Sequence, residues 1–211
     1  MTDTETPKSG AAGAVAAPAR RPDPDAALVR QCLDGDVRAF ESLFRKYQAP
    51  IFNLVSRMVG EGDAHDLTQD VFCNALRSLH TFRGDSKFST WLYTIARNVC
   101  LNRIRHSSCR REESLDAICE EQPYAELPDC AVDVEAITET RELQRLVNSI
   151  LATLPPEQRL LITLRDFEQL SYEEIACVMG ISLSSVKSRL HRARMAFKSK
   201  FKPYLRLFKE G

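Results

Sequence analysis

The sequence predicts an all-α fold in which two small helical domains are joined by a flexible linker. Apolar residues recur at helical spacing from residue 25 to about residue 106, and again from residue 134 onward. No stretch alternates apolar and polar residues as a half-buried strand would. Between the two helical stretches, residues 107–133 are acidic, contain Pro123 and Pro128, and lack an apolar face. We therefore expect domains at residues 25–106 and 134–211, with a linker between them.

The first domain follows a compositionally biased segment. Residues 1–24 are rich in Ala, Pro, Gly, Ser and Thr and have no periodicity, so we expect a disordered tail there. The first domain then reads as successive helices. Asp36 is expected to cap one helix, and Pro50 to begin the next, because proline suits the first turn of a helix. Asp63 is expected to begin a third helix, which ends near Leu79.

The last helix of this domain is predicted at residues 89–105, after a loop at residues 80–88. The loop places aromatic residues beside a cation, and the helix interleaves cations, amides and hydroxyls. Aromatic rings that stack on bases, together with Arg side chains that hold phosphates, suit single-stranded DNA. The other interpretation of these aromatic residues is a packed core. Four apolar residues share one helical face and are expected to point inward: Phe88, Trp91, Ile95 and Val99.

A helix-turn-helix is predicted near the C-terminal end. Ser171 and Glu174 form an S-x-x-E capping box at the start of its first helix. Gly180 suits a left-handed turn, since glycine has no Cβ, and Ser182 is a candidate N-cap for the second helix. In such units the second helix enters the major groove of DNA. The plainer alternative is a helical hairpin with a solvated basic face.

Charge is segregated along the chain although the formal net charge is +0. Acidic residues dominate residues 110–142, whereas none occurs in residues 187–209. Cations accumulate in that last segment: Lys187, Arg189, Arg192, Arg194, Lys198, Lys200, Lys202 and Arg206. This separation indicates a nucleic-acid surface at the C-terminal end.

Nothing in the sequence assembles an enzyme site. The chain contains no glycine-rich phosphate loop, no H-E-x-x-H and no G-x-S-x-G motif, and its histidines are isolated. Asp63, Asp66 and Asp70 lie at helical spacing, but a solvated or protein-binding face is favoured over a metal site. We therefore expect no catalysis, no cofactor and no metal.

The cysteines and the hydropathy indicate the compartment. Seven cysteines are scattered without a C-x-x-C pair, which fits a reducing compartment. We expect most of them to be buried small hydrophobes, with redox sensing by Cys109, Cys119 or Cys130 as an alternative. No apolar run approaches the ~20 residues of a membrane helix, and the N-terminus lacks a signal-peptide core. We therefore expect a soluble, cytoplasmic chain without membrane insertion.

Three long strings of the sequence occur in a set order: LVRQCLDGDVRAFESLFRKY, DAHDLTQDVFCNALRSLHTFRGDSKFSTWLYTIARNVCLNRIR, and LPPEQRLLITLRDFEQLSYEEIACVMGISLSSVKSRLHRARMAF. Together they resemble the extracytoplasmic-function (ECF) sigma factors of bacterial RNA polymerase. The resemblance covers most of residues 25–106 and 150–197. It implies sigma domain 2 at residues 25–106 and sigma domain 4, with its helix-turn-helix, at residues 134–211.

The resemblance also implies a function and its partners. Such a protein is an alternative sigma factor, which directs promoter recognition, promoter melting and transcription initiation. The implied partners are core RNA polymerase, promoter DNA as duplex and as melted non-template strand, and an anti-sigma factor. The polymerase would be contacted by the helix after Asp63, through Asp66, Gln69, Asp70 and Arg77.

Two further sets of residues are implied to bind DNA. The minus-ten element would be read and opened by the loop and the helix after it, through Phe82, Arg83, Asp85, Ser86, Asn98, Arg103 and Arg105. The minus-thirty-five element would be read by the second helix of the helix-turn-helix, through Ser184, Ser185, Lys187, Ser188, His191 and Arg192. The promoter sequence itself does not follow from the resemblance.

Two other functions compete with this one. A stand-alone helix-turn-helix regulator would bind duplex DNA tightly without polymerase, and it leaves the string FRGDSKFSTWLYTIARN unexplained. An adaptor that binds polymerase without touching DNA would tolerate loss of the basic side chains Lys187 and Arg192.

Overall fold

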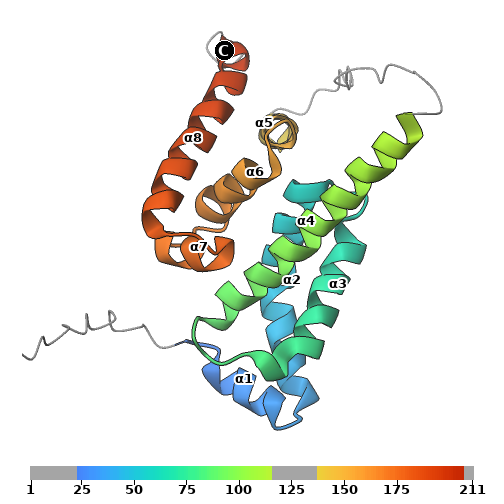
Figure 1. Ribbon diagram of the computed structural model, residues 1–211, viewed down its shortest axis with the longest axis vertical. Helices are drawn as coiled ribbons and strands as arrows, with labels where there is room; N and C mark the ends of the chain where they lie inside the picture. The colour runs from blue at the N-terminus through green and yellow to red at the C-terminus, as the bar shows by residue number, and fades with distance from the viewer. Residues whose placement is uncertain (1–22, 116–136, 207–211) are drawn as a thin grey trace, which may run out of the picture.

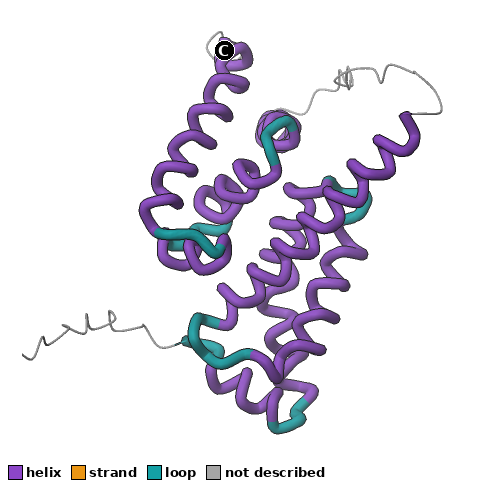
Figure 2. The backbone as a smooth tube through the Cα atoms, viewed as in Figure 1, coloured by secondary structure: helices purple, strands orange, loops and turns teal. Residues whose placement is uncertain are grey.

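The structure, a computed structural model, describes residues 23–115 and 137–206. Within those ranges the chain consists of helices and loops without a strand (Figure 2), as predicted. Two groups of helices lie side by side (Figure 1). The first group comprises α1 (Ala26–Leu33), α2 (Val37–Val59), α3 (Ala64–Ser78), a 3-10 turn (Leu79–Thr81) and α4 (Phe88–Leu115). The second comprises α5 (Ile137–Ala152), α6 (Pro156–Ile162), a π-helical turn (Thr163–Phe167), α7 (Tyr172–Met179), α8 (Leu183–Phe201) and a 3-10 turn (Lys202–Arg206).

Helix α2 runs unbroken through Pro50, so the prediction of two separate helices there is wrong. Its N-terminus is as predicted, because Asp36 Oδ1 accepts a hydrogen bond from Arg38 N–H at 2.9 Å. A proline inside a helix removes one backbone hydrogen bond and costs about 3 kcal/mol or more. The buried residues on either side of Pro50 form one stripe, from Ala39 to Met58. Burial of that continuous stripe offsets the loss.

The buried face of α4 is displaced from the predicted one. Phe88 is buried as expected, but Trp91, Ile95 and Val99 are only half-buried. The residues of α4 that fill the core are Leu92, Tyr93, Ala96 and Cys100. Because α4 contacts α2 and α3 in its own domain and α7 in the other, more than one of its faces is covered. The single stripe inferred from the sequence is therefore too narrow.

Helix α4 also extends into the segment predicted as linker. It continues to Leu115, beyond the predicted end at residue 105. The second group of helices begins at Ile137. The rest of the predicted linker, and nearly all of the predicted tail, lie outside the described residues.

Helices α7 and α8 form the predicted helix-turn-helix. Ser171 Oγ accepts a hydrogen bond from Glu174 N–H at 3.1 Å, and Glu174 Oε2 accepts one from Ser171 N–H at 2.8 Å. Gly180 has φ 65° and ψ 35°, which is the left-handed conformation expected. Ser182 Oγ accepts a hydrogen bond from Ser185 N–H at 3.3 Å at the start of α8. Val186, Leu190 and Ala193 form the buried side of α8.

The two groups of helices are in direct contact. In the π-helical turn, Glu168 N–H donates to the Thr163 carbonyl, five residues earlier, at 3.0 Å. The Arg57 guanidinium of α2 lies 4.2 Å from the centre of the Phe167 ring. Tyr93 OH of α4 donates to Glu168 Oε2 at 3.1 Å. Burial raises the pKa of Glu168, against the opposing effects of the Tyr93 hydrogen bond and the Arg57 charge.

Candidate nucleic-acid interface

The outer face of α3 presents charged, amide and apolar side chains together. All four residues predicted to contact polymerase are exposed: Asp66, Gln69, Asp70 and Arg77. Leu76 is also exposed, to 55%, and so is Cys73. Sequence reasoning missed Leu76 and Cys73. The signal that could have found them is that each is an apolar residue lying outside the buried stripe of an amphipathic helix. A mixed polar and apolar face is typical of a non-obligate protein interface.

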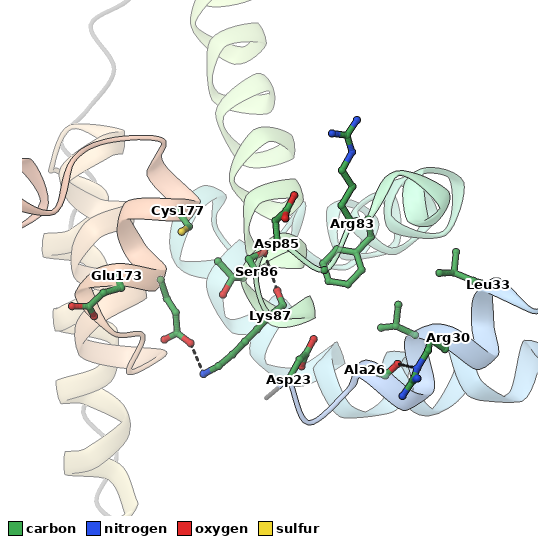
Figure 3. Close-up of a pocket in the computed structure, with 15 residues that line it drawn as sticks. Asp23, Ala26, Arg30, Leu33, Arg83, Asp85, Ser86, Lys87, Glu173 and Cys177 are labelled. Atoms are coloured by element: carbon green, nitrogen blue, oxygen red, sulfur yellow. Dashed lines mark hydrogen bonds and ion pairs between the residues drawn. The ribbon is translucent and has the colours of Figure 1, made fainter. Parts of the chain in front are cut away.

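Residues 82–87 form the loop between the 3-10 turn and α4, and we call them the base loop. The Phe82 ring centre lies 5.4 Å from that of Trp91 and 6.0 Å from that of Phe88. Phe82 is therefore half-buried and anchors the start of the loop. Arg83 and Asp85 are exposed and Ser86 is half-buried, and Figure 3 shows the first two projecting from the loop.

The C-terminal end of the base loop is fixed by a residue distant in sequence. Phe88 N–H, at the start of α4, donates to Asp23 Oδ2 at 2.8 Å. The other oxygen of that carboxylate accepts a hydrogen bond from Asp25 N–H at 3.0 Å. Sequence reasoning placed Asp23 in the tail and missed this contact. A pairing 65 positions apart leaves no periodic signal.

A buried carboxylate holds the same N-terminal segment to α2. Asp25 is only 2% exposed, and it accepts hydrogen bonds from Lys46 Nζ at 2.5 Å and from Tyr47 OH. Burial raises the pKa of Tyr47, and the hydrogen bond to Asp25 and its charge raise it further. The phenol therefore stays protonated and donates to Asp25. These contacts fix residues 23–25 beside the base loop.

A cavity of about 660 Å³ lies where α1, the base loop and α7 meet (Figure 3). Its volume is within the range of pockets that hold small organic ligands. Lys87 Nζ of the base loop lies 2.7 Å from Glu174 Oε1 of α7. Burial alone would raise the pKa of Glu174, but hydrogen bonds from Lys87 and from the Ser171 backbone outweigh that effect and lower it. The α7 wall of the cavity consists of Glu173, Glu174 and Cys177.

The predicted DNA-contacting residues of α4 differ in their surroundings. Asn98 is exposed and accepts a hydrogen bond on Oδ1 from Arg97 Nη1 at 3.3 Å. Arg103 donates to Asp63 Oδ2 from Nε at 2.9 Å and from Nη2 at 2.7 Å. That pair ties α4 to the residue before α3, so the Arg103 guanidinium is engaged within the protein. Arg105 is exposed.

The exposed face of α8 carries most of the predicted duplex-reading side chains. Lys187, Ser188, His191 and Arg192 are exposed. Ser184 and Ser185 also belong to the cap of α8, since their hydroxyls lie 3.1 Å and 2.9 Å from Ser182 Oγ. Two other cations of the helix are paired inside the domain: Arg189 with Glu157 at 3.2 Å, and Arg194 with Asp166. Fewer cations of α8 are therefore available to a partner than the sequence suggested.

The expectation that most cysteines are buried is wrong for the described part of the chain. Cys100 is buried and Cys32 is partly buried, but Cys73 and Cys177 are exposed. Both exposed cysteines lie on helix faces turned away from the core, so their size does not draw them inward. The side chains of the remaining cysteines, Cys109, Cys119 and Cys130, lie outside the described residues.

Two absences concern residues 23–115 and 137–206, the part of the chain that the structure describes. Within these ranges, no cluster of three or more His, Cys, Asp and Glu side chains could hold a metal ion. The helices described there include none that is long and apolar enough to cross a bilayer.

Comparison with known protein families matches both helical groups. The family described as Sigma-70 region 2 matches residues 43–109, and the family described as Sigma-70, region 4 matches residues 144–197. The chain is 39% identical over 185 residues to the ECF RNA polymerase sigma-E factor of Escherichia coli (strain K12), which covers 86% of this chain and 96% of that protein. It is also 39% identical over 186 residues to the RNA polymerase sigma-H factor of Pseudomonas aeruginosa, with the same two coverages.

Two solved structures share the fold. CnrH, in complex with the cytosolic domain of CnrY, superimposes with a TM-score of 0.64 at 25% identity, covering 86% of this chain and 99% of that one. The sigma factor RpoE from Bartonella quintana, in complex with the anti-sigma factor NepR, gives a TM-score of 0.60 at 23% identity. That match covers 79% of this chain and 98% of the other.

Proposed function

This chain belongs to the ECF group of the sigma-70 family, and we propose how its surfaces divide the work of an alternative sigma factor. As such a factor it directs transcription initiation. The observation that carries the assignment is the order of the two family regions, each on its own group of helices and each with an exposed polar face. We assign sigma domain 2 to residues 25–106 and sigma domain 4 to residues 134–211.

The outer face of α3 is the proposed contact with core RNA polymerase. Its side chains include Asp66, Gln69, Asp70 and Arg77, and Leu76 adds an exposed apolar surface among them. Charged residues at such a face steer association and fix its register, whereas the apolar side chain gains by desolvation. We therefore place Leu76 in the interface, although the sequence alone did not indicate it.

The base loop and the adjoining part of α4 are the proposed minus-ten site. Opening the duplex costs stacking and pairing energy, and capture of an extruded base offsets part of it. The cavity beside the loop supplies space for that base, and Phe82, Arg83, Asp85 and Ser86 lie on its wall. Asn98, Arg103 and Arg105 lie further along α4. If Arg103 binds a phosphate, it must first leave Asp63.

The exposed face of α8 is the proposed minus-thirty-five site. Major-groove readout requires donors on a narrow helical face, and Lys187, Ser188, His191 and Arg192 provide one. Ser184 and Ser185 sit at the N-terminus of α8, where hydroxyls and backbone amides suit phosphate. Two weak contacts on one chain gain affinity through effective concentration once polymerase holds both domains on the promoter.

The remaining proposals concern partners, compartment and catalysis. The solved relatives include complexes with the cytosolic domain of CnrY and with the anti-sigma factor NepR, which supports an anti-sigma factor as a partner of this chain. We propose that the chain acts in the cytoplasm, where RNA polymerase works, and that it has no enzymatic activity. A stand-alone helix-turn-helix regulator is not favoured, because the region 2 match spans residues 43–109 outside the helix-turn-helix.

Run-off transcription tests the function directly. The purified chain is combined with core RNA polymerase and a library of genomic fragments. We expect discrete transcripts from at least one fragment, and none with core enzyme alone. If the chain formed no complex with core enzyme and no transcript appeared from any fragment, the assignment as a sigma factor would be wrong.

The contact with polymerase has its own test. Asp70→Ala removes an exposed carboxylate from α3, and we expect weaker association with core enzyme in a pull-down titration. Glu142→Ala makes the same charge change at an exposed position on α5 and serves as the control. Equal binding by the two variants would exclude Asp70 from the interface.

A further inference from the structure

The first N–H group of helix α4 is held by a residue distant in sequence. The first N–H groups of any helix have no partner within the helix and require acceptors from elsewhere. Lys87 stands immediately before α4, and its ammonium can donate hydrogen bonds but cannot accept one. The acceptor for Phe88 N–H is instead Asp23 Oδ2, at 2.8 Å. The cap is thus supplied by a residue that lies 65 positions earlier in the same chain.

This cap is one of two anchors that define the base loop. At its beginning, Phe82 packs against the rings of Trp91 and Phe88. At its end, Asp23 holds Phe88 N–H. Between the anchors, Gly84 has φ 72°. Glycine adopts this conformation easily and leaves it easily, so Gly84 does not by itself fix the shape of the loop. The ion pair between Lys87 and Glu174 also holds the end of the loop, but Glu174 belongs to the other domain. If the contact with Asp23 were lost, that ion pair between the domains would remain.

Asp23 is itself held from two sides. Its second carboxylate oxygen accepts a hydrogen bond from Asp25 N–H at 3.0 Å, and its carbonyl accepts one from Ala26 N–H at 3.2 Å. Asp25 in turn is fixed on α2 by Lys46 and Tyr47. Figure 3 shows Asp23 at the edge of the cavity, near Lys87 and below Asp85 and Ser86. A continuous chain of hydrogen bonds therefore runs from α2, through Asp25 and Asp23, to the end of the loop.

We propose that Asp23 is a positioning residue for promoter melting, which holds the base loop in the shape that receives an unstacked base. The proposal rests on the function proposed above for the loop. Asp23 acts through the backbone of Phe88 and need not touch DNA. Its charge would on its own repel phosphate, so a purely electrostatic role predicts the opposite effect on substitution.

Three variants separate these possibilities. Asp23→Ala removes both hydrogen bonds that the side-chain carboxylate accepts. Asp23→Asn removes the charge but keeps one carbonyl oxygen, so it can retain one of the two bonds. Asp36→Ala removes a cap of the same residue type from α2, where Asp36 accepts from Arg38 N–H at 2.9 Å, and it serves as the matched control.

Hydrogen exchange in the free full-length chain reports on the anchor itself. Loss of a helix cap shifts a local equilibrium by about five- to thirtyfold. We expect exchange in a peptide spanning residues 82–88 to accelerate by that factor in Asp23→Ala, by less in Asp23→Asn, and not at all in Asp36→Ala. Unchanged exchange in Asp23→Ala would overturn the proposal whatever the chain does with polymerase.

Promoter opening reports on the consequence. The variants are assembled with core enzyme on a promoter found by run-off transcription, and unpaired thymines are detected with permanganate. We expect Asp23→Ala to reduce opening roughly five- to thirtyfold, with Asp23→Asn intermediate and core-enzyme association unchanged for both. Normal opening by Asp23→Ala, or increased opening by both Asp23 variants, would contradict a positioning role. Absence of transcription with the wild-type chain would instead count against the proposed function, and the exchange measurement would still decide the anchor.

Discussion

The turn of the helix-turn-helix supports a quantitative prediction at Gly180. Its φ of 65° and ψ of 35° lie in the left-handed region, where a residue with a Cβ is strained by about 1–2 kcal/mol. A Cβ built at this position meets no heavy atom within 4 Å, so the whole effect of Gly180→Ala comes from backbone conformation. We expect a loss of about 1–2 kcal/mol in the free energy of unfolding, or roughly 2–8 °C in the melting temperature for a chain of this size.

Two further substitutions make the Gly180 argument testable. Gly180→Asn should cost less than Gly180→Ala, because asparagine tolerates the left-handed region better. Gly62→Ala places a Cβ at a position that is equally open but whose φ is not in that region, so it should be neutral or slightly stabilising. Urea and thermal unfolding of the three variants give the comparison. If Gly180→Ala were as stable as Gly62→Ala, the assignment of the cost to backbone strain would be wrong.

Three other outcomes follow from described contacts. Asp25→Ala leaves Tyr47 OH buried without its acceptor and should cost about 1.5–3 kcal/mol in urea unfolding; a cost near zero would mean that the buried pair adds nothing to stability. Arg192→Ala should weaken minus-thirty-five binding by about 1–3 kcal/mol if the side chain contacts a base, and unchanged run-off output would refute that contact. Burial raises the pKa of Cys100 to about 12, so in peptide mapping of the folded chain a thiol reagent should label the exposed Cys177 and spare Cys100. Equal labelling of the two cysteines would contradict the burial of Cys100. The Cys100 thiol loses its proton near pH 9 in the unfolded chain but retains it there in the folded chain, so the stability that Cys100 contributes should decline from about pH 9 toward pH 12.

The parts of the fold that the sequence predicted are those with local causes. The capping box of Ser171 and Glu174, the left-handed Gly180 and the cap at Ser182 each involve residues within three positions of one another. Their geometry follows from residue type and spacing, so a single sequence suffices. The order of the helices and the exposed face of α8 follow from periodicity in the same way.

The parts that the sequence did not predict depend on contacts between distant residues. Helix α2 passes through Pro50 because packing on both sides outweighs a local preference. Asp23 and Asp25 became structural residues only through Phe88 and Tyr47, which lie 65 and 22 positions away. These pairs carry no spacing signal, which is why the support of the base loop could not be seen in the sequence.

The π-helical turn at Thr163–Phe167 has a consequence for how this chain tolerates changes in length. A turn that closes over five residues holds one residue more than an α-helical turn needs, and Phe167 and Glu168 meet Arg57 and Tyr93 from that wider turn. Removing a single amino acid there would let the turn close over four residues, as in an ordinary α-helix, and would leave the residues after it in phase. The loss would fall on the contacts that the wider turn itself makes between the two domains, those of Phe167 and Glu168. A one-residue deletion in the regular helix α8 would instead turn every later residue of that helix by about 100°, so the seam between the domains is where the chain should best tolerate a change in length.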